Sequence, residues 1–258
     1  MLYLGISLLG LLAGVMSGLF GIGGGIVMVP LLTAVFGFSL LSASGSSLAA
    51  LLLPVSLTAI LEYRKKGNLD IRVAAIFAFG IVCGSFFGAN FAMYLPITVL
   101  QTIYGGFLLW VCYRFSGFKL FSKQNPENKQ ENNGKMSHTI LQILPWGIFA
   151  GVLSGLFGIG GGIVMVPIMV TVLKFNPQTA IATSLAALLP PSGLPGVISY
   201  YNAGHVDIVI ALILAAGLDI GAYFGARINL SLSTQNVKRL YAIFLFVMAV
   251  NYIISALL

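Results

Sequence analysis

Charged residues are scarce in this chain of 258 residues. Asp, Glu, Lys and Arg together make up 7% of it, against about 25% in an average soluble domain. None of the four occurs in 1–61, 73–113, 136–173, 175–206 or 240–258. A helix needs about 20 apolar residues to cross the hydrocarbon core of a bilayer, and these tracts supply them repeatedly. The scarcity excludes a soluble enzyme, a nucleic-acid binder and a secreted disulfide module, and it predicts an all-α polytopic membrane protein.

Cysteine and the usual catalytic groups are equally sparse. Cys83 and Cys112 lie inside apolar tracts without metal-ligand spacing, so we expect buried free thiols and no metal or cofactor. Paired acids, a His cluster and a Ser–His arrangement are absent at membrane depth, which argues against a membrane-embedded enzyme and leaves no catalytic residue to assign. The net charge of +7 comes from Lys and Arg in short loops, where such residues orient a membrane chain.

The chain contains one unit twice. Gly14–Pro30 and Gly151–Pro167 are identical at sixteen of seventeen positions, and an offset of 137 residues relates them. The same offset continues without a gap and pairs Asp70 with Asp207. A single integral membrane domain is therefore predicted over 1–258. It comprises repeat 1 over 1–115, a polar linker over 116–137 and repeat 2 over 138–258.

Each repeat contains four apolar segments, at 3–36, about 44–62, 71–94 and 97–115, and at about 140–173, 181–201, 207–228 and 237–257. Prolines interrupt the second segments, at Pro54 and at Pro190, Pro191 and Pro195. Gly21–Gly25 breaks the first segment. The arm after this break is about 18 Å long at 1.5 Å per residue, too short to span comfortably. A hairpin and one broken span remain alternative conformations.

The Lys and Arg residues favour inverted repeats. Nine lie in or just after repeat 1, in its second loop and after its last segment, and four lie in the other loops of repeat 2. If the repeats were parallel, nine of these residues would lie on one side of the membrane and four on the other. Inverted repeats place all thirteen on one side, as the positive-inside rule expects. Eight single crossings with parallel halves remain the alternative.

The glycine run Gly21–Gly25 and its copy Gly158–Gly162 carry the strongest functional signal. Each has four glycines in five residues, and each glycine costs a helix interior about 1 kcal/mol relative to alanine. Backbone groups freed at membrane depth are tolerated where they are buried in protein or line a watery cavity. A helix restarting at Ile26 or Ile163 would aim free N–H groups there, which favours an anion. Tight helix crossing is the alternative role.

Serines accompany both breaks. Their hydroxyls are suited to donate to an oxyanion, although serine also satisfies helix backbone. The predicted substrate-binding residues are Ser17, Gly21, Gly23, Gly24, Gly25, Ser47, Ser154, Gly158, Gly160, Gly161, Gly162, Ser184 and Arg227.

Asp219 is the acidic residue in the middle of an apolar tract, where a carboxylate is costly and usually functional. It is a candidate for proton coupling, with a structural hydrogen-bonded acid as the alternative. Gly217, Gly221 and Gly225 form a stripe for helix packing, and Asp219 points away from that stripe at 3.6 residues per turn. Arg227 follows the stripe and either contacts an anion or anchors the helix end. Asp70 and Asp207 are expected to be N-caps.

The doubled S-G-L-F-G-I-G-G-G-x-x-x-V-P motif, the T/S-S-L-x-A that follows it and the G-x-x-x-G-x-x-x-G segment resemble the sulfite exporter TauE/SafE family of membrane transporters. The resemblance covers about 230 of the 258 residues. It implies a carrier of small sulfur-containing anions, such as sulfite or organosulfonates, in the bacterial cytoplasmic membrane. Asn90 stands where the second repeat has Arg227, so a paired arginine site is not implied.

We therefore expect a multi-pass transporter of small anions, most of all sulfur oxyanions or organosulfonates, working by alternating access between the repeats. Its partners are the lipid bilayer and a small inorganic or organic anion, and no nucleic acid. A channel, or a carrier for another small ion or metabolite, is the alternative. The cargo, the direction, the coupling ion and the oligomeric state stay open at this point.

Overall fold

The structure is a computed structural model that describes residues 2–53, 57–115, 139–231 and 246–256. Every regular element in these residues is a helix, so the predicted all-α class is confirmed. The chain divides into two compact units, Met1–Leu95 with Ile140–Leu232, and Pro96–Thr139 with Ser233–Leu258. Pro54, the linker over 116–137 and the start of the last apolar segment lie outside the described residues.

The first unit contains five helices from each repeat. Those of repeat 1 are α1 (Leu2–Phe20), α2 (Gly25–Ala34), α3 (Leu40–Ala50), α4 (Leu57–Lys65) and α5 (Ile71–Tyr94). Those of repeat 2 are α7 (Ile140–Phe157), α8 (Gly162–Thr171), α9 (Pro177–Leu188), α10 (Leu194–Asn202) and α11 (Ile208–Ser231). Four long stretches in the described residues are apolar enough to cross a membrane: α1, α5, α7 and Ile208–Asn229 of α11.

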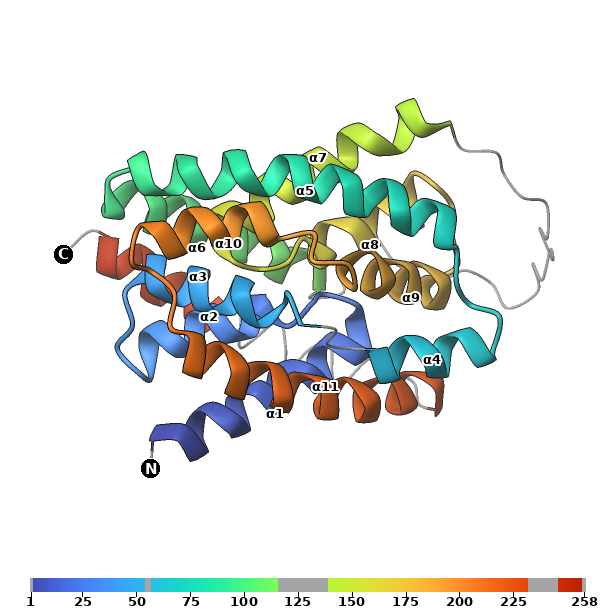
Figure 1. Cartoon of the computed structure of the whole chain (residues 1–258), viewed down its shortest axis with the longest axis horizontal. Coiled ribbons are helices and arrows are strands. Elements are labelled where there is room, and N and C mark those ends of the chain that lie inside the picture. The colour runs from blue at the N-terminus through green and yellow to red at the C-terminus, as the bar shows by residue number, and fades with distance from the viewer. Residues whose placement is uncertain (1, 54–56, 116–138, 232–245, 257–258) are drawn as a thin grey trace. The chain divides into compact units, whose positions relative to one another are not determined.

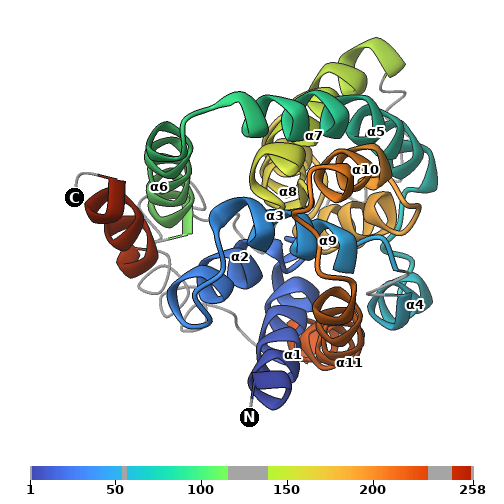
Figure 2. The same ribbon diagram turned by 60° about the vertical axis from the view of Figure 1, so that its left-hand side comes forward.

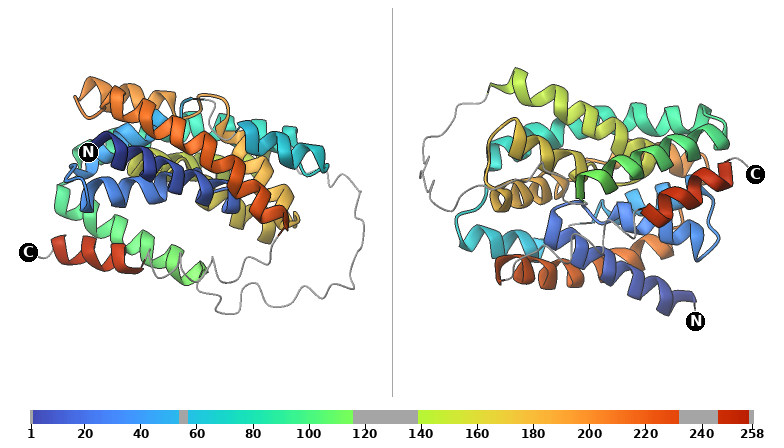
Figure 3. Two further views of the ribbon diagram at one scale, coloured as in Figure 1. Left: turned by 90° about the horizontal axis from the view of Figure 1, so that it is seen from below. Right: turned by 180° about the vertical axis from the view of Figure 1, so that it is seen from behind.

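The predicted breaks divide the first and second segments into short helices. Both glycine runs separate a long helix from one of ten residues, α1 from α2 and α7 from α8. Figures 1 and 3 show the chain reversing direction at the first break, so this segment is a hairpin. Pro190 and Pro191 lie between α9 and α10, and Pro195 is in the first turn of α10. Proline fits there because the first helical N–H groups need no partner within the helix.

The long helices pack in two pairs, α1 with α11 and α5 with α7. Glycine stripes face each other at both contacts. A Cβ atom on Gly84 would collide with the carbonyl oxygen of Ile148 in α7, and one on Gly221 with that of Leu11 in α1. The glycines therefore let the two backbones approach, as in small-residue contacts between membrane helices. This confirms the packing role predicted for the stripe in α11.

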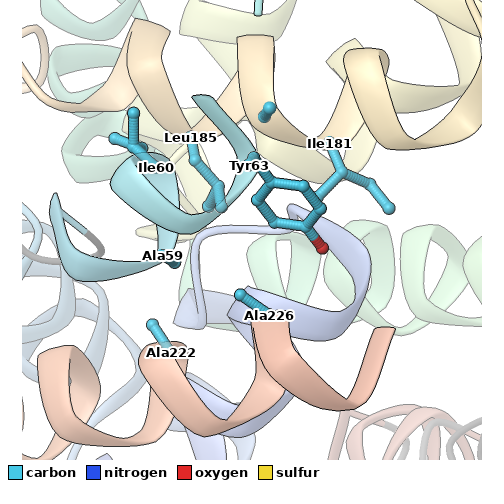
Figure 4. Close-up of a cluster of buried hydrophobic side chains, with 8 residues drawn as sticks. Ala59, Ile60, Tyr63, Ile181, Leu185, Ala222 and Ala226 are labelled. Carbon is cyan, nitrogen blue, oxygen red and sulfur yellow. The ribbon is translucent and has the colours of Figure 1, made fainter. Parts of the chain in front are cut away.

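The short helices fill the space between these two pairs, as Figures 1 and 2 show for α3, α8 and α9. Tyr63 from α4 inserts its ring among Ile181 and Leu185 of α9 and Ala226 of α11 (Figure 4). Its ring is fully buried. Asp70 and Asp207 cap α5 and α11, since each side chain accepts from the N–H three residues later, at 3.0 Å. The predicted N-caps are thus confirmed.

Equivalent long helices of the two repeats, α1 with α7 and α5 with α11, run in opposite directions. In Figure 1, α1 and α11 run from left to right, and α5 and α7 from right to left. The end of α4, the start of α5, the α8–α9 connection and the end of α11 therefore lie at one end of this unit. These places carry all of its Lys and Arg residues: Arg64, Lys65, Lys66, Arg72, Lys174 and Arg227. The α2–α3 and α10–α11 connections at the opposite end carry none.

The second unit contains α6 (Ile97–Phe115), which matches the predicted segment, and a helix over Phe246–Ala256. Tyr104 and Tyr252 join these two helices edge to face, with ring centroids 5.0 Å apart. Aromatic pairs favour this geometry because a ring edge is positive and a ring face negative.

Candidate functional site

The two glycine breaks lie directly against each other. Gly24 and Gly161 precede α2 and α8 in the left-handed conformation, with φ of 80° and 76°, which glycine adopts without steric cost. A Cβ atom on Gly25 would collide with the carbonyl oxygen of Gly158, and one on Gly162 with that of Gly21. Glycine is therefore needed both for the turn and for the approach of the second backbone.

Three carbonyl groups around the first break accept hydrogen bonds from other helices. Tyr63 donates from its hydroxyl to Gly18 O at 2.9 Å, and Asn229 from Nδ2 to Leu19 O at 2.7 Å. Ser184 Oγ donates to Gly21 O at 2.8 Å. These bonds satisfy carbonyls that the end of α1 leaves without a partner in the helix.

The second break repeats this pattern from the opposite repeat. Tyr200 donates from its hydroxyl to Gly155 O at 2.8 Å and to Leu156 O at 3.2 Å. Ser47 Oγ donates to Gly158 O at 2.8 Å. Each break therefore has one carbonyl capped by a serine from the other repeat.

The N–H groups of the breaks are left without such partners. The last backbone N–H of α1's hydrogen-bond pattern is that of Gly21, which donates to Ser17 O. The next N–H groups that donate are those of Val27 and Met28, and both donate to Gly24 O. Among the described residues, no bond is donated by the N–H groups of 22–26. The same holds of 159–163 in the second break, and all ten residues are buried. Buried N–H groups without an acceptor are rare in proteins, so this is where a ligand with acceptor atoms is expected.

Two serine hydroxyls add to this set of free donors. Ser17 and Ser154 occupy equivalent places in α1 and α7, both fully buried. Neither hydroxyl has a hydrogen-bond partner in the described structure. Ser154 also lines a small cavity of ≈ 10 Å³, together with Leu48, Leu51, Ile81, Gly160, Leu188, Ser192 and Gly193. That volume is about enough for one water molecule.

The structure brings most of the predicted site residues together. The glycines of both runs, Ser47 and Ser184 meet at the crossing of the breaks, and Ser17 and Ser154 lie one turn before them. Free donors beside capped acceptors make the electrostatic character of this region positive without a charged side chain. The arrangement is suited to hold a negative group.

Arg227 and Asp219 lie elsewhere on α11. Arg227 is exposed, and its guanidinium stacks on the ring of Tyr223, 4.5 Å from the centroid. The structure does not place it among the buried glycines, so its contact with substrate stays a prediction. Asp219 is partly buried and accepts from Thr58 Oγ1 of α4 at 3.2 Å, on a face of α11 other than the one against α1, as predicted.

Sequence reasoning missed several residues of this region. Tyr63 and Tyr200 match under the offset of 137, but nothing in the local sequence tells that their hydroxyls reach carbonyls 45 residues away. Leu51 and Leu188 end the repeated Ser-Leu-Ala-Ala-Leu motif. The identical positions of these tyrosines and leucines in the two copies were the sequence signal that could have found them.

The helices of the described residues, four of them long and apolar enough to cross a membrane, define the class of polytopic membrane protein. The family model described as Sulfite exporter TauE/SafE matches residues 6–252. The chain belongs to this family.

Three relatives match this chain over most of both lengths. It is 31% identical to the probable membrane transporter protein YunE of Bacillus subtilis, over 92% of each chain. It is 29% identical to a probable membrane transporter protein of Methanocaldococcus jannaschii, over 90% of this chain and 88% of the relative. The YdhB protein of Bacillus subtilis, another probable membrane transporter, is 30% identical over 84% and 86%. No solved structure matches.

We expect Ser47→Ala and Ser184→Ala each to lower the free energy of unfolding by about 1–3 kcal/mol, because each leaves a buried carbonyl without its donor. Ser7→Ala is the matched control, since Ser7 is an exposed serine whose hydroxyl donates to Tyr3 O within its own helix. Thermal unfolding of the purified variants in detergent measures the difference. Equal melting temperatures for Ser47→Ala and Ser7→Ala would contradict the capping role.

Proposed function

We propose that the protein carries small anions, above all sulfur-containing oxyanions or organosulfonates such as sulfite, across the bacterial cytoplasmic membrane. The observation that carries the proposal is the crossing of the two glycine breaks, where buried N–H groups lack acceptors while the neighbouring carbonyls are capped. The family and its probable membrane transporters support transport. The family's description as a sulfite exporter supports the choice of sulfite.

The same geometry weighs against the alternative of a cation channel or cation carrier. Dehydrated cations in membrane proteins are coordinated by carbonyl or carboxylate oxygens. Here one carbonyl of each break already accepts a serine hydroxyl, Gly158 O from Ser47 and Gly21 O from Ser184. Within the described residues, no three His, Cys, Asp or Glu side chains gather in a way that suits a metal ion.

Alternating access between two inverted repeats is the proposed mechanism. The contacts between the repeats are reciprocal: Ser47 reaches Gly158, and its equivalent Ser184 reaches Gly21. Reciprocal contacts of this kind arise when a two-fold axis relates two units. The opposed helix directions and the gathering of Lys and Arg at one end support the same relation.

The proposed movement follows from how little space the breaks enclose. Since the cavity of ≈ 10 Å³ holds about one water molecule, an anion of several heavy atoms requires the repeats to separate on one side. Rocking of one repeat against the other around a midplane site supplies that opening in transporters built from inverted repeats.

Anion binding is expected to raise the melting temperature of the purified protein. An anion present at 100 times its Kd stabilises the native state by about 2.7 kcal/mol. We expect Ser154→Ala to raise the Kd about 10- to 100-fold, because a hydrogen bond to a charged group contributes about 1.5–3 kcal/mol. Sodium sulfite, thiosulfate and methanesulfonate are the probes, and chloride salts of several cations are the reference.

The control for this experiment is Ser7→Ala, which should leave the anion response unchanged. Uptake of the same anions into proteoliposomes supplies the functional readout. A protein that neither shifts its melting temperature nor takes up any of these anions would refute anion transport. Conductance in planar bilayers would instead favour the channel.

The inverted arrangement predicts that Gly37 and Lys174, which the repeat makes equivalent, face opposite sides of the membrane. Both are exposed, in the α2–α3 and α8–α9 connections. With Cys83 and Cys112 replaced by alanine, Gly37→Cys and Lys174→Cys should react with a membrane-impermeant thiol reagent from opposite sides of sealed vesicles. Reaction of both from one side would establish parallel halves.

Asp219 is the group that we propose for proton coupling, because it is a partly buried carboxylate within a membrane-capable helix. Asp219→Asn keeps an oxygen for Thr58 but removes the titratable group. We expect at least a tenfold loss of anion uptake driven by a pH gradient, with anion-dependent thermal stabilisation retained. Asp70→Asn keeps an N-cap and serves as control. Unchanged pH-driven uptake in Asp219→Asn would rule out the coupling role.

A further inference from the structure

Two leucines lie over the crossing of the glycine breaks. Leu188 is the last residue of α9, and its repeat equivalent Leu51 follows the last residue of α3. Both are almost fully buried, with 7% and 5% of their surface exposed. Both line the cavity that Ser154 lines.

The side-chain tips of these leucines touch the glycines of both breaks. A Cβ atom on Gly160 would lie 2.7 Å from Cδ1 of Leu51 and 3.7 Å from Cδ1 of Leu188. One on Gly23 would lie 2.9 Å from Cδ1 of Leu188. Leu188 therefore lies against the break of each repeat, and leucine methyl groups occupy the space directly beside these glycines.

The cavity is lined by residues of both long and short helices. Ser154 is in the long helix α7 and Ile81 in the long helix α5, and these two helices pack against each other. The leucines stand instead at the ends of short helices, beside the interruptions between α3 and α4 and between α9 and α10. A leucine side chain can change rotamer, and truncating one in a protein core has opened a cavity of about 150 Å³.

We propose that Leu51 and Leu188 determine the largest anion that the site accepts and close the free N–H groups off from water when the site is empty. This inference rests on the proposed function and adds its specificity-determining residues. The leucines offer no hydrogen bond, so they select by volume, whereas the N–H groups and the Ser154 hydroxyl select by charge.

The closure is tested first by thiol accessibility, which requires no transport. Ser154→Cys is introduced with Cys83 and Cys112 replaced by alanine, and its reaction with 2-sulfonatoethyl methanethiosulfonate is timed. We expect the rate to rise at least tenfold when Leu188→Ala or Leu51→Ala is added. Leu188→Val, a smaller truncation, should give an intermediate rate and covers the case that an alanine variant does not fold.

Leu185→Ala is the matched control. Leu185 lies one turn earlier on α9 and is 1% exposed, but it packs into the cluster of Ala59, Ile60 and Tyr63 (Figure 4). Its truncation removes the same atoms and carries a similar stability cost, about 2–5 kcal/mol for a buried leucine, without opening the cavity. A rate that rises equally in Leu185→Ala and Leu188→Ala reflects general loosening and would overturn the proposal.

Size selection is then measured by uptake of sulfite, methanesulfonate, propanesulfonate and benzenesulfonate into proteoliposomes. We expect the original protein to take up only the smaller anions, and Leu188→Ala and Leu51→Ala to gain at least tenfold on the larger ones. An unchanged size limit overturns the role of the leucines while leaving anion transport intact. Failure of the original protein to take up or bind any anion refutes the proposed function, and the size selection with it.

Discussion

Helix ends buried in an apolar interior must have their backbone polar groups satisfied by protein, because no bulk water reaches them. That constraint organises the centre of this molecule. The helices α1 and α7 end in the buried interior of the protein. Carbonyls at these two ends accept hydrogen bonds from Tyr63, Tyr200, Ser47, Ser184 and Asn229. No comparable acceptors meet the N–H groups among the described residues. The proposed anion site rests on this imbalance between bonded carbonyls and free N–H groups.

Each repeat provides a hydrogen-bond donor for a backbone carbonyl of the other repeat. The serine that caps a break comes from the opposite repeat, and each repeat's glycines make room for the other's carbonyl. Tyr63 and Tyr200 instead reach back to the long helix of their own repeat. The carbonyls at each break therefore accept hydrogen bonds from a tyrosine of the same repeat and from a serine of the other repeat.

The repeats are not equivalent in detail. Asn90 of repeat 1 donates from Nδ2 to Ser199 Oγ of repeat 2 at 3.0 Å. The equivalent positions hold Arg227 and Glu62, at the end of the first unit that carries its Lys and Arg residues. Ser85 of α5 donates to Ser192 O beside the cavity, at 3.4 Å, whereas its equivalent Ala222 belongs to an apolar cluster. A duplicated scaffold therefore carries different chemistry at its two ends.

Local features of the fold were predictable because they depend on local chemistry. The bounds of α5 and α6 follow from the apolar runs, and the breaks follow from residues that cannot continue a helix, Gly21–Gly25 and the prolines after α9. The predicted glycines and serines of the two breaks lie together in the structure, and their duplication in the sequence marks them; their role in binding a substrate stays a prediction. Three features were not predictable from the sequence, because each depends on the path of a different helix. They are the bonds from the capping tyrosines, the surface position of Arg227 and the placement of Leu51 and Leu188 beside the breaks.

The sequence by itself determined that this chain is a helical membrane protein of two repeats, each with a glycine-broken first segment. Charge content, apolar run length and internal identity are properties of the chain that no packing can alter. Tertiary structure decided which helices pair, which carbonyls are capped and which N–H groups stay free. Those outcomes depend on the fit between surfaces more than 100 residues apart in the chain, such as Ser47 with Gly158, and complementarity of shape at that distance is not written in any local pattern.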